Sequence, residues 1–408
     1  MTKPLDVQNE VPPIFKLITR QFMHNPYPTL SELRLSRAAT PIETNGFRMW
    51  LVTRYADARK LLGNPILEKD LVAVKEKIEH CLVRPEKHST LPRPVRRSMF
   101  EQDGDNHRRL RRLISHVFTS KRIAQMAPKV ERVADDLLEK LPTGESIDLF
   151  RTYIRPLVTT VLSDLLGIPP ESRDEFYDWA NGTMTSTTPQ AGGEAGRRMY
   201  AFCHEMADLK RREPRDDLFT ELVEMERVGS MDFEEVIATM FLLLVGGTEP
   251  ASAAANGVLT LLSHPDQLAK VLADPALWPD CVEEVLRYET SFRILPPRHC
   301  PVAVELDDIT IPPNELIAVA NSSANRDPAQ FDRADVFDIT RKSRNHLAFG
   351  HGPHKCLGAV LGRLEVNTVL RKLFARFPHT TLAVPPEELN WLPATLLRRV
   401  GSLPVVLR

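Results

Sequence analysis

Residues Phe349–Gly358 read Phe-Gly-His-Gly-Pro-His-Lys-Cys-Leu-Gly, and this stretch decides the fold. Its three glycines and one proline allow the backbone to turn tightly around a bulky object and to direct amide N–H groups at the cysteine sulfur. A helical apolar pattern follows at Leu364, Val366, Val369, Leu370 and Leu373. Because the N-terminus of a helix favours negative charge, the sequence predicts a stabilised thiolate at Cys356. We interpret Cys356 as the ligand of a haem iron.

Two other roles for this cysteine are weaker. A single cysteine is most often a small buried apolar residue, but the turn-forming context of Cys356 is unusual for a core position. A zinc site would use His346, His351 and His354. Structural zinc sites usually show two paired sets of cysteine or histidine ligands, and this loop contains one cysteine.

The composition is that of a globular protein. The chain has 408 residues, is 42% hydrophobic and carries a formal net charge of -1, so it shows no bias toward nucleic acid or a membrane. Its longest strongly apolar run, Met240–Val245, is much shorter than the roughly 20 residues of a spanning helix. Residues 1–11 show no signal-like apolar segment, and the 5 scattered cysteines are typical of reduced thiols. We expect a cytoplasmic protein.

No linker or repeat divides the chain, so we expect one domain over residues 1–408. The expected class is mainly α with small β-sheets. Apolar patterning predicts a β-richer N-terminal part over about 1–65 and a helical body over about 66–290 and 356–378. Segments of β type are predicted over about 300–320 and 380–408.

The longest apolar helix is predicted from an N-cap at Asp232 to His264-Pro265. Pro250 lies in its middle and has no N–H group, and its ring clashes with the carbonyl of Gly246. The helix should therefore bend or open there, leaving that carbonyl free. The segment 181–196 is rich in Gly, Thr and Ser and is predicted to be a mobile loop.

Two charged pairs have helical spacing. His107 and Arg111 are four apart on a helix that we expect Asp105 to cap, so they share a face and suit one anionic group. A solvated basic helix is the commoner explanation of such charges. Glu284 and Arg287 are three apart, and they can be buried only if they are hydrogen-bonded to each other.

Taken together, these motifs resemble the cytochrome P-450 haem-thiolate family of the soluble bacterial type over nearly the full length. The cysteine loop resembles the haem-binding signature, Glu284-x-x-Arg287 the helix K pair, and residues 232–264 the long central helix I. Ala324–Pro328 resembles the segment that leads toward the haem loop. The resemblance implies the family fold, with helix I lying over haem b.

The resemblance also implies roles for individual residues. Cys356 would bind the iron, with Phe349 and Gly350 beside its sulfur and Leu357 and Gly358 at the start of the next helix. The haem propionates would be held by His107, Arg111, Arg298 and His354. Glu284 and Arg287 would be structural. The activity implied is oxidation of a small organic substrate, most simply a secondary metabolite, with O2 and electrons from a separate ferredoxin and ferredoxin reductase.

The chain departs from the family where protons are delivered. The family usually has an acid followed by an alcohol on helix I, and here the matching residues are Gly246, Gly247, Thr248, Glu249 and Pro250. Glu249 matches the acid, whereas Pro250 replaces the usual threonine. We expect proton delivery through ordered water, the carbonyl of Gly246 or a polar group of the substrate. Alternatively, Pro250 only shapes the helix.

Other functions remain compatible with these residues. The enzyme could join or close aromatic rings by oxidative carbon–carbon or carbon–nitrogen coupling, without inserting oxygen. A protein of another class, a haem-binding sensor with little turnover, is the second alternative, and the loss of the threonine is its main support.

By resemblance, the substrate pocket is lined by several segments. Its expected lining includes Leu242, Val245, Phe292, Arg293, Ile294, Leu295, Trp391 and Leu392. Arg293 would grip a carboxylate or carbonyl and Trp391 would stack on an aromatic ring, although structural roles are commoner for both types. A basic surface for an acidic ferredoxin is expected from Arg108, Arg109, Arg112, Lys355 and Arg363. We expect a monomer that binds neither nucleic acid nor a membrane.

Overall fold

The computed structural model describes residues 14–17, 19–87, 92–186, 188–342 and 344–408. The α-helices are α1 (Arg20–His24), α2 (Tyr27–Ser36), α3 (Tyr55–Gly63), α4 (Gly104–Ser115), α5 (Ser120–Leu138), α6 (Arg155–Leu166), α7 (Arg173–Thr185), α8 (Pro189–Arg212), α9 (Leu218–Arg227), α10 (Phe233–Gly247), α11 (Pro250–Leu262), α12 (Pro265–Ala273), α13 (Trp278–Tyr288), α14 (Asn321–Ala324) and α15 (Ala359–Arg376). The predicted class, mainly α with small sheets, is confirmed.

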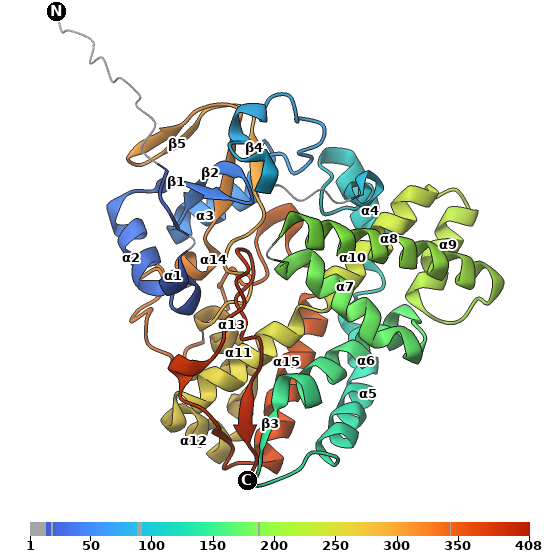
Figure 1. Cartoon of the computed structure of the whole chain (residues 1–408), viewed down its shortest axis with the longest axis vertical. Coiled ribbons are helices and arrows are strands. Elements are labelled where there is room, and N and C mark those ends of the chain that lie inside the picture. The colour runs from blue at the N-terminus through green and yellow to red at the C-terminus, as the bar shows by residue number, and fades with distance from the viewer. Residues whose placement is uncertain (1–13, 18, 88–91, 187, 343) are drawn as a thin grey trace, which may run out of the picture.

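The strands form small sheets at two ends of the molecule (Figure 1). They are β1 (Ala39–Thr44), β2 (Phe47–Val52), β3 (Ser146–Asp148), β4 (Arg298–Cys300), β5 (Val304–Leu306), β6 (Ile309–Ile311), β7 (Glu315–Val319), β8 (Thr381–Leu382) and β9 (Pro404–Val406). Among the described residues, one sheet has the order β1-β2-β7-β4, and its β2 and β7 are parallel, with Trp50 opposite Ile317. The others have the orders β3-β9-β8 and β5-β6.

The central helix is divided into α10 and α11. Asp232 accepts a hydrogen bond from the backbone of Glu235, whose side chain bonds back to the Asp232 amide, so the predicted cap is confirmed as a capping box. α10 ends at Gly247, and α11 begins at Pro250, where a missing N–H costs little. The predicted opening at the proline is confirmed.

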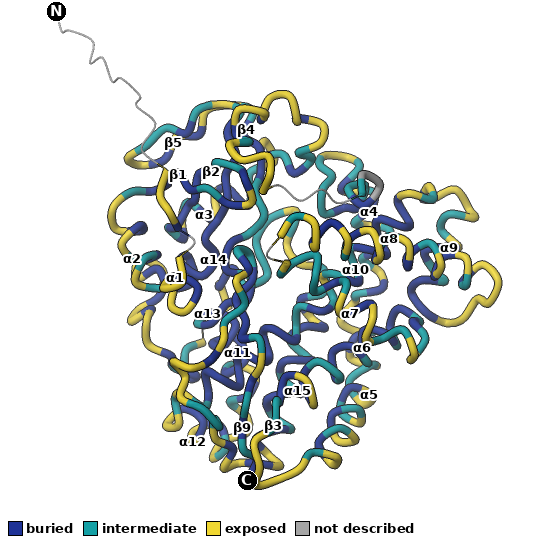
Figure 2. Tube along the Cα trace, viewed as in Figure 1, coloured by how far each residue is buried: buried dark blue, intermediate teal, exposed yellow. Residues whose placement is uncertain are grey.

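Helices α11 and α13 are largely buried (Figure 2). By length and composition, Phe233–Leu262 is also apolar enough to cross a membrane, but 61% of its most apolar window is buried inside the protein. Its apolar surface is therefore used in the main hydrophobic core, which it shares with residues of α5, α6, α13 and α15.

Two local predictions are wrong. Asp105 does not cap α4: the helix begins at Gly104, and Asp103, two residues before the predicted cap, is its N-cap. Residues 181–196 are not mainly a loop, because α7 continues to Thr185 and α8 begins at Pro189. The Cβ that an alanine would add at Gly182 would lie 2.9 Å from the Cβ of Ala195, so small residues here allow two helices to pack closely.

Candidate active site

The cysteine loop needs its glycines at two positions. Gly350 and Gly352 have φ of 69° and 73°, a region that residues with a side chain rarely adopt. A Cβ at Gly352 would also lie 2.5 Å from the carbonyl oxygen of Leu62 at the end of α3. The loop is closed by the amide of Cys356, which donates to the carbonyl of Phe349 at 2.9 Å. The absence of a side chain at Gly352 thus allows the loop to pack closely against α3.

Cys356 is exposed as a residue, although the protein around it is dense enough to desolvate the thiol. Desolvation raises the pKa of the Cys356 thiol, and the amide of Gly358 and the guanidinium of Arg111 only partly oppose this. The sequence predicted several amides at the sulfur, but only the Gly358 amide is identified there among the described residues. The Cys356 amide instead donates to a carbonyl within the loop.

The loop lies beside the break in the central helix. Gly362, on α15, is near both the ring of Phe349 and the ring of Pro250, since an added Cβ would lie 3.7 Å from each. The guanidinium of Arg363 stacks over Phe349 at 4.4 Å. Cys356, Pro250 and Glu249 therefore belong to one region, as expected.

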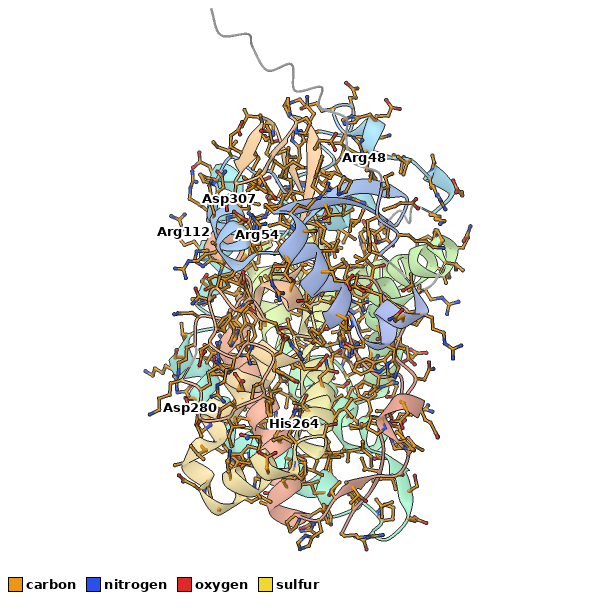
Figure 3. All side chains as sticks on the ribbon, turned by 90° about the vertical axis from the view of Figure 1, so that its left-hand side faces the viewer. Arg48, Arg54, Arg112, His264, Asp280 and Asp307 are labelled. Atoms are coloured by element: carbon orange, nitrogen blue, oxygen red, sulfur yellow. The ribbon has the colours of Figure 1, made fainter. Side chains whose placement is uncertain are left out.

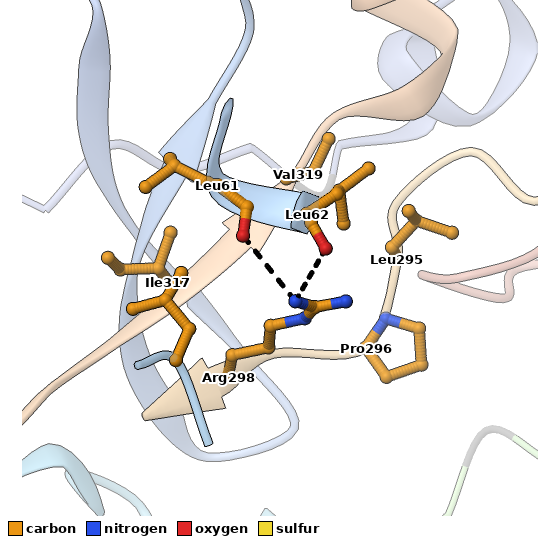
Figure 4. A pocket seen from close by; sticks show the side chains of 8 residues that line it. Leu61, Leu62, Leu295, Pro296, Arg298, Ile317 and Val319 are labelled. Carbon is orange, nitrogen blue, oxygen red and sulfur yellow. Dashed lines mark hydrogen bonds between the residues drawn. The ribbon is translucent and has the colours of Figure 1, made fainter. Parts of the chain in front are cut away.

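Basic side chains converge on one side of this region. The rings of His107 and His354 lie 4.2 Å apart. Arg298 is buried and donates to the carbonyls of Leu61 at 3.4 Å and Leu62 at 3.0 Å (Figure 4). Arg111 donates to the carbonyl of Lys355 at 2.7 Å, next to Cys356. The structure thus brings together the four residues predicted to hold propionates.

These charges lack enough counter-charge. Burial, and then the charges of His354 and Arg111, lower the pKa of His107 to about 4, and burial lowers the pKa of Arg298 to about 10. Nε2 of His107 is buried without a hydrogen-bond partner among the described residues. The nearby acid is Asp103, which contacts His354 at 3.6 Å. Buried basic groups with depressed pKa values fit a ligand that brings carboxylates, as haem does.

Lys69 is a member of this cluster that the sequence interpretation missed. Its side chain is buried, its ammonium lies 4.0 Å from the centre of the Phe100 ring, and its backbone amide donates to Asp103 at 2.6 Å. Burial, followed by the charge of Arg298, lowers the pKa of Lys69 to about 7. A bare lysine in a long loop gives no local sequence signal, since its neighbours come from other parts of the chain.

Glu249 is an acid poised to exchange a proton. Burial raises its pKa to about 7, while the hydroxyls of Ser291 and Ser252 and the charge of Arg399 oppose the increase. Its Oε1 is buried and has no hydrogen-bond partner among the described residues. The two serine hydroxyls were not identified from the sequence, although Ser252 follows Glu249 closely.

A small hollow opens beside Glu249, with a volume of about 30 Å³. It is lined by Tyr177, Asn181, Met184, Val245, Gly246, Thr248, Glu249, Ser252, Phe292 and Leu397. Arg399 donates to Oδ1 of Asn181 at 3.0 Å. Since arginine can only donate, the amide oxygen must face Arg399 and the NH2 group of Asn181 points elsewhere. Of the predicted pocket residues, Val245 and Phe292 line this hollow.

The carbonyl of Gly246 is not free. It accepts hydrogen bonds from the amides of Thr248 and Glu249, the latter at 3.4 Å, because the chain tightens before Pro250. The prediction that this carbonyl is released for proton delivery is therefore wrong. Gly246 itself is exposed and nothing lies within 4 Å of where its Cβ would be, so the helix leaves a flat approach here, as a porphyrin requires.

Arg293 does not reach this hollow. It is 1% exposed, donates to the carbonyls of Ala394 and Thr395, and lies over the ring of Phe22 at 4.9 Å. The predicted grip on a substrate is wrong, since these carbonyls occupy its guanidinium. Ile294 is likewise buried in a separate core cluster.

The remaining predicted pocket residues are peripheral to the hollow. Arg398 stacks on Trp391 at 3.6 Å, which leaves this face of the indole unavailable to a substrate ring. The amide of Leu392 donates to the carbonyl of Arg399 at 2.9 Å. Leu242 packs against the main core, and Leu295 lines a second small pocket with Arg298 (Figure 4).

Glu284 and Arg287 form a buried ion pair. Both carboxylate oxygens of Glu284 accept from Arg287 at 2.7 Å, and the pair is almost fully buried. Arg287 also donates to the carbonyls of Asn325 at 2.9 Å and Ala334 at 2.8 Å. The mutual hydrogen bonds are those that the sequence required for burial.

Known proteins match this chain along most of its length. The cytochrome P450 family model matches residues 196–400. Cytochrome P450 107B1 of Saccharopolyspora erythraea is 39% identical over 387 residues, which cover 94% of this chain and 95% of that protein. The 6-deoxyerythronolide B hydroxylase of the same organism is 35% identical over 392 residues, with 93% and 95% covered. The tirandamycin C-bound P450 monooxygenase TamI has a TM-score of 0.90 at 31% identity, covering 96% of this chain and 99% of that one.

Proposed function

Since the chain belongs to the cytochrome P450 family and is an oxidoreductase of the monooxygenase type, we propose that it oxidises a small secondary metabolite with O2 and electrons from a separate ferredoxin and its reductase. We propose haem b as the cofactor, residues 1–408 as one monomeric domain, and the cytoplasm as the location. All 5 cysteines are free, which supports a reducing compartment. The sensor alternative has no support in relatives named as hydroxylases and monooxygenases.

The observation that carries the proposal is the placement of Glu249. A protonatable carboxyl with an unpartnered oxygen lies on the wall of a hollow, next to a helix break and on the side of the cysteine loop. Haem, when bound, supplies the iron that activates O2. Cys356 would hold that iron, and His107, Arg111, Arg298, His354 and Lys69 would hold the two propionates.

The residues above the ring would deliver protons and position the substrate. With a pKa of about 7, Glu249 can take up and release a proton near neutral pH, and the hydroxyls of Ser252 and Ser291 lie beside it. We propose that these hydroxyls take over the part of the threonine that Pro250 replaces. The Asn181 amide on the same wall offers a donor to a carbonyl or hydroxyl of the substrate, with its orientation fixed by Arg399.

A ferredoxin would dock near the cysteine loop. Of the basic residues expected there, Arg109 is engaged with Glu235 and Arg363 with Glu283, whereas Arg112 and Lys355 are exposed. Figure 3 shows Arg112 pointing outward from the side of the molecule. An acidic partner is therefore expected to bind faster at low salt, and Arg112→Glu should weaken this salt dependence, since Lys355 remains.

Product mass tests the reaction. The purified protein, with haem, should give the carbon monoxide difference band of a thiolate ligand and convert a substrate found by its spin-state shift. A product heavier by one oxygen atom supports monooxygenation, whereas loss of hydrogens with ring closure or joining supports oxidative coupling. A protein that gives the thiolate band but no turnover with any reduced ferredoxin contradicts the proposed activity.

Replacing Lys69 is expected to weaken haem binding. A charge-assisted hydrogen bond is worth about 1.5–3 kcal/mol, so Lys69→Met should release haem to a haem acceptor roughly 10- to 100-fold faster. The reduction potential should also become more negative, because one buried positive charge near the ring is lost. Lys75→Met, which removes an exposed charge from the same segment, is the control. Equal release rates for both variants would show that Lys69 does not contact the cofactor.

Replacing Ser252 and Pro250 tests whether the serine hydroxyls take the place of the missing threonine. Ser252→Ala should lower the fraction of NADH consumption that ends in product, since it removes a hydroxyl next to Glu249. Pro250→Thr should not raise that fraction, because the serines already supply hydroxyls. Coupling is measured as product formed for each NADH oxidised. Clearly better coupling in Pro250→Thr, with the same product, would mean that the serines do not replace the threonine and that the protein only tolerates its loss.

A further inference from the structure

Three potential metal ligands meet at the sheet end of the molecule, away from the cysteine loop. His80 and Cys81 are consecutive residues of a short 3-10 turn (Glu79–Cys81), and Glu315 is the first residue of β7. Among the residues that the structure describes, this is the one group of three His, Cys, Asp or Glu residues whose ligand atoms all lie within 4.8 Å of one another. Neither the family resemblance nor the proposed reaction uses them.

The distances between these side chains are close to those between the ligands of a tetrahedral metal ion. Nε2 of His80 lies 3.5 Å from Sγ of Cys81 and 3.3 Å from Oε1 of Glu315, and Sγ lies 3.9 Å from Oε2. Ligands at ordinary zinc distances and tetrahedral angles would be about 3.6 Å apart for sulfur and nitrogen, about 3.4 Å for nitrogen and oxygen, and about 3.6 Å for sulfur and oxygen. The two distances to Glu315 end on different oxygens, so its carboxylate would rotate to present one oxygen to both His80 and Cys81.

The surroundings also suit a metal. Cys81 and Glu315 are buried, whereas the His80 side chain is 48% exposed, so a fourth position can be filled from solvent. Arg48, on the neighbouring strand β2, contacts Oε1 of Glu315 at 2.5 Å. Ligating carboxylates commonly have such an outer hydrogen-bond donor, which orients them toward the metal. Figure 3 shows Arg48 at the upper end of the molecule, opposite His264.

We propose that His80, Cys81 and Glu315 bind Zn²⁺, with water as the fourth ligand. A tetrahedral arrangement of thiolate, imidazole and carboxylate ligands is typical of zinc, whereas Mg²⁺ and Ca²⁺ prefer oxygen ligands. The thiol of Cys81 loses its proton to solvent when the metal binds. The ion would link the segment that carries Lys69 to β7. It would thereby stabilise the position of Lys69 among the basic residues that are proposed to hold the propionates.

Metal counting tests the site in the holoprotein. The protein is stripped with a chelator, equilibrated with zinc sulfate, passed over a desalting column and analysed for zinc, and its affinity is measured by competition with a chromophoric chelator. Wild type should retain one zinc, and His80→Ala and Cys81→Ser should each bind it at least about 100-fold more weakly. Cys300→Ser, which removes a buried thiol that donates to the carbonyls of Pro312 and Glu315, should bind zinc like wild type.

X-ray absorption at the zinc edge gives a second, independent result. One sulfur neighbour at about 2.3 Å is expected in wild type and its loss in Cys81→Ser. Should Cys81→Ser not fold, His80→Ala still decides, because its side chain is half-exposed and its loss leaves the core intact. Equal zinc affinity in wild type and His80→Ala, or a zinc shell without sulfur, overturns the proposal. The haem content of each preparation is measured separately, so this outcome is independent of the proposed oxidation.

Discussion

Glu249→Gln is expected to lower the turnover rate about 100- to 10 000-fold, which is the usual contribution of a positioned proton donor. Glutamine keeps the size and the hydrogen-bonding atoms of the side chain but cannot release a proton. The buried Oε1 without a partner among the described residues and the pKa near 7 identify this carboxyl as the acid beside the hollow that changes its protonation near neutral pH. Product formation under saturating ferredoxin measures the effect.

The pH dependence should change with it. Burial raises the pKa of Glu249 from 4.5 to about 7, so the protonated donor is lost as the pH rises through about 7, and the wild-type rate should fall there. Glu249→Gln should lack this decline. The raised pKa also means that stability present below about pH 4.5 is lost through about pH 7, so the glutamine variant should gain up to about 3 kcal/mol relative to wild type at high pH.

Glu234→Gln is the matched control. Glu234 lies in the first turn of α10, is 53% exposed and pairs with Arg97, so its replacement should leave both rate and pH profile unchanged. A Glu249→Gln enzyme within a few-fold of wild type, with the same decline above pH 7, would remove Glu249 from the proton path. The serines would then have to act through water alone.

Arg287→Met is expected to destabilise the fold by about 3–5 kcal/mol, because it leaves the buried carboxylate of Glu284 without its main partner. The carbonyls of Asn325 and Ala334 lose their donor at the same time. Denaturant unfolding followed by far-ultraviolet circular dichroism measures the change. The double variant Glu284→Leu with Arg287→Met should recover part of the loss, since no unpaired charge remains.

An exposed pair provides the comparison. Arg344 contacts Asp280 at 3.3 Å with a side chain that is 68% exposed, so Arg344→Met should cost less than about 1 kcal/mol. Comparable losses for Arg287→Met and Arg344→Met would mean that burial adds nothing to the Glu284 pair.

Features set by neighbouring residues could be predicted from the sequence. The capping box at Asp232 and the opening at Pro250 depend on residues within one or two turns, and the cysteine loop depends on its own glycines. The predicted Asp105 cap is wrong for the opposite reason, because a distant segment decides the helix start: Asp103 accepts from the amides of Lys69 and Asp70. Those amides lie in a segment with no helical pattern to read.

The roles decided by distant contacts could not be predicted. Arg293 looked available to a substrate, yet its acceptors, Ala394 and Thr395, come from the C-terminal part of the chain. Asn181 was assigned to a loop by composition, whereas packing between α7 and α8 makes it helical and Arg399 orients its amide. Tertiary contacts outweighed local preference at both positions.

The pairing of β2 with β7 has a consequence for how the chain reaches this structure. Arg48 and Glu315, which face each other across these strands, are 267 residues apart in the chain. Closing so long a loop loses entropy before any contact between the strands is gained, and contacts of this kind slow folding. The helices, whose contacts are local, should therefore form first. Until β7 pairs with it, the β2 edge of the β1–β2 hairpin should remain unpaired. We expect refolding to end with a slow phase in which this sheet closes.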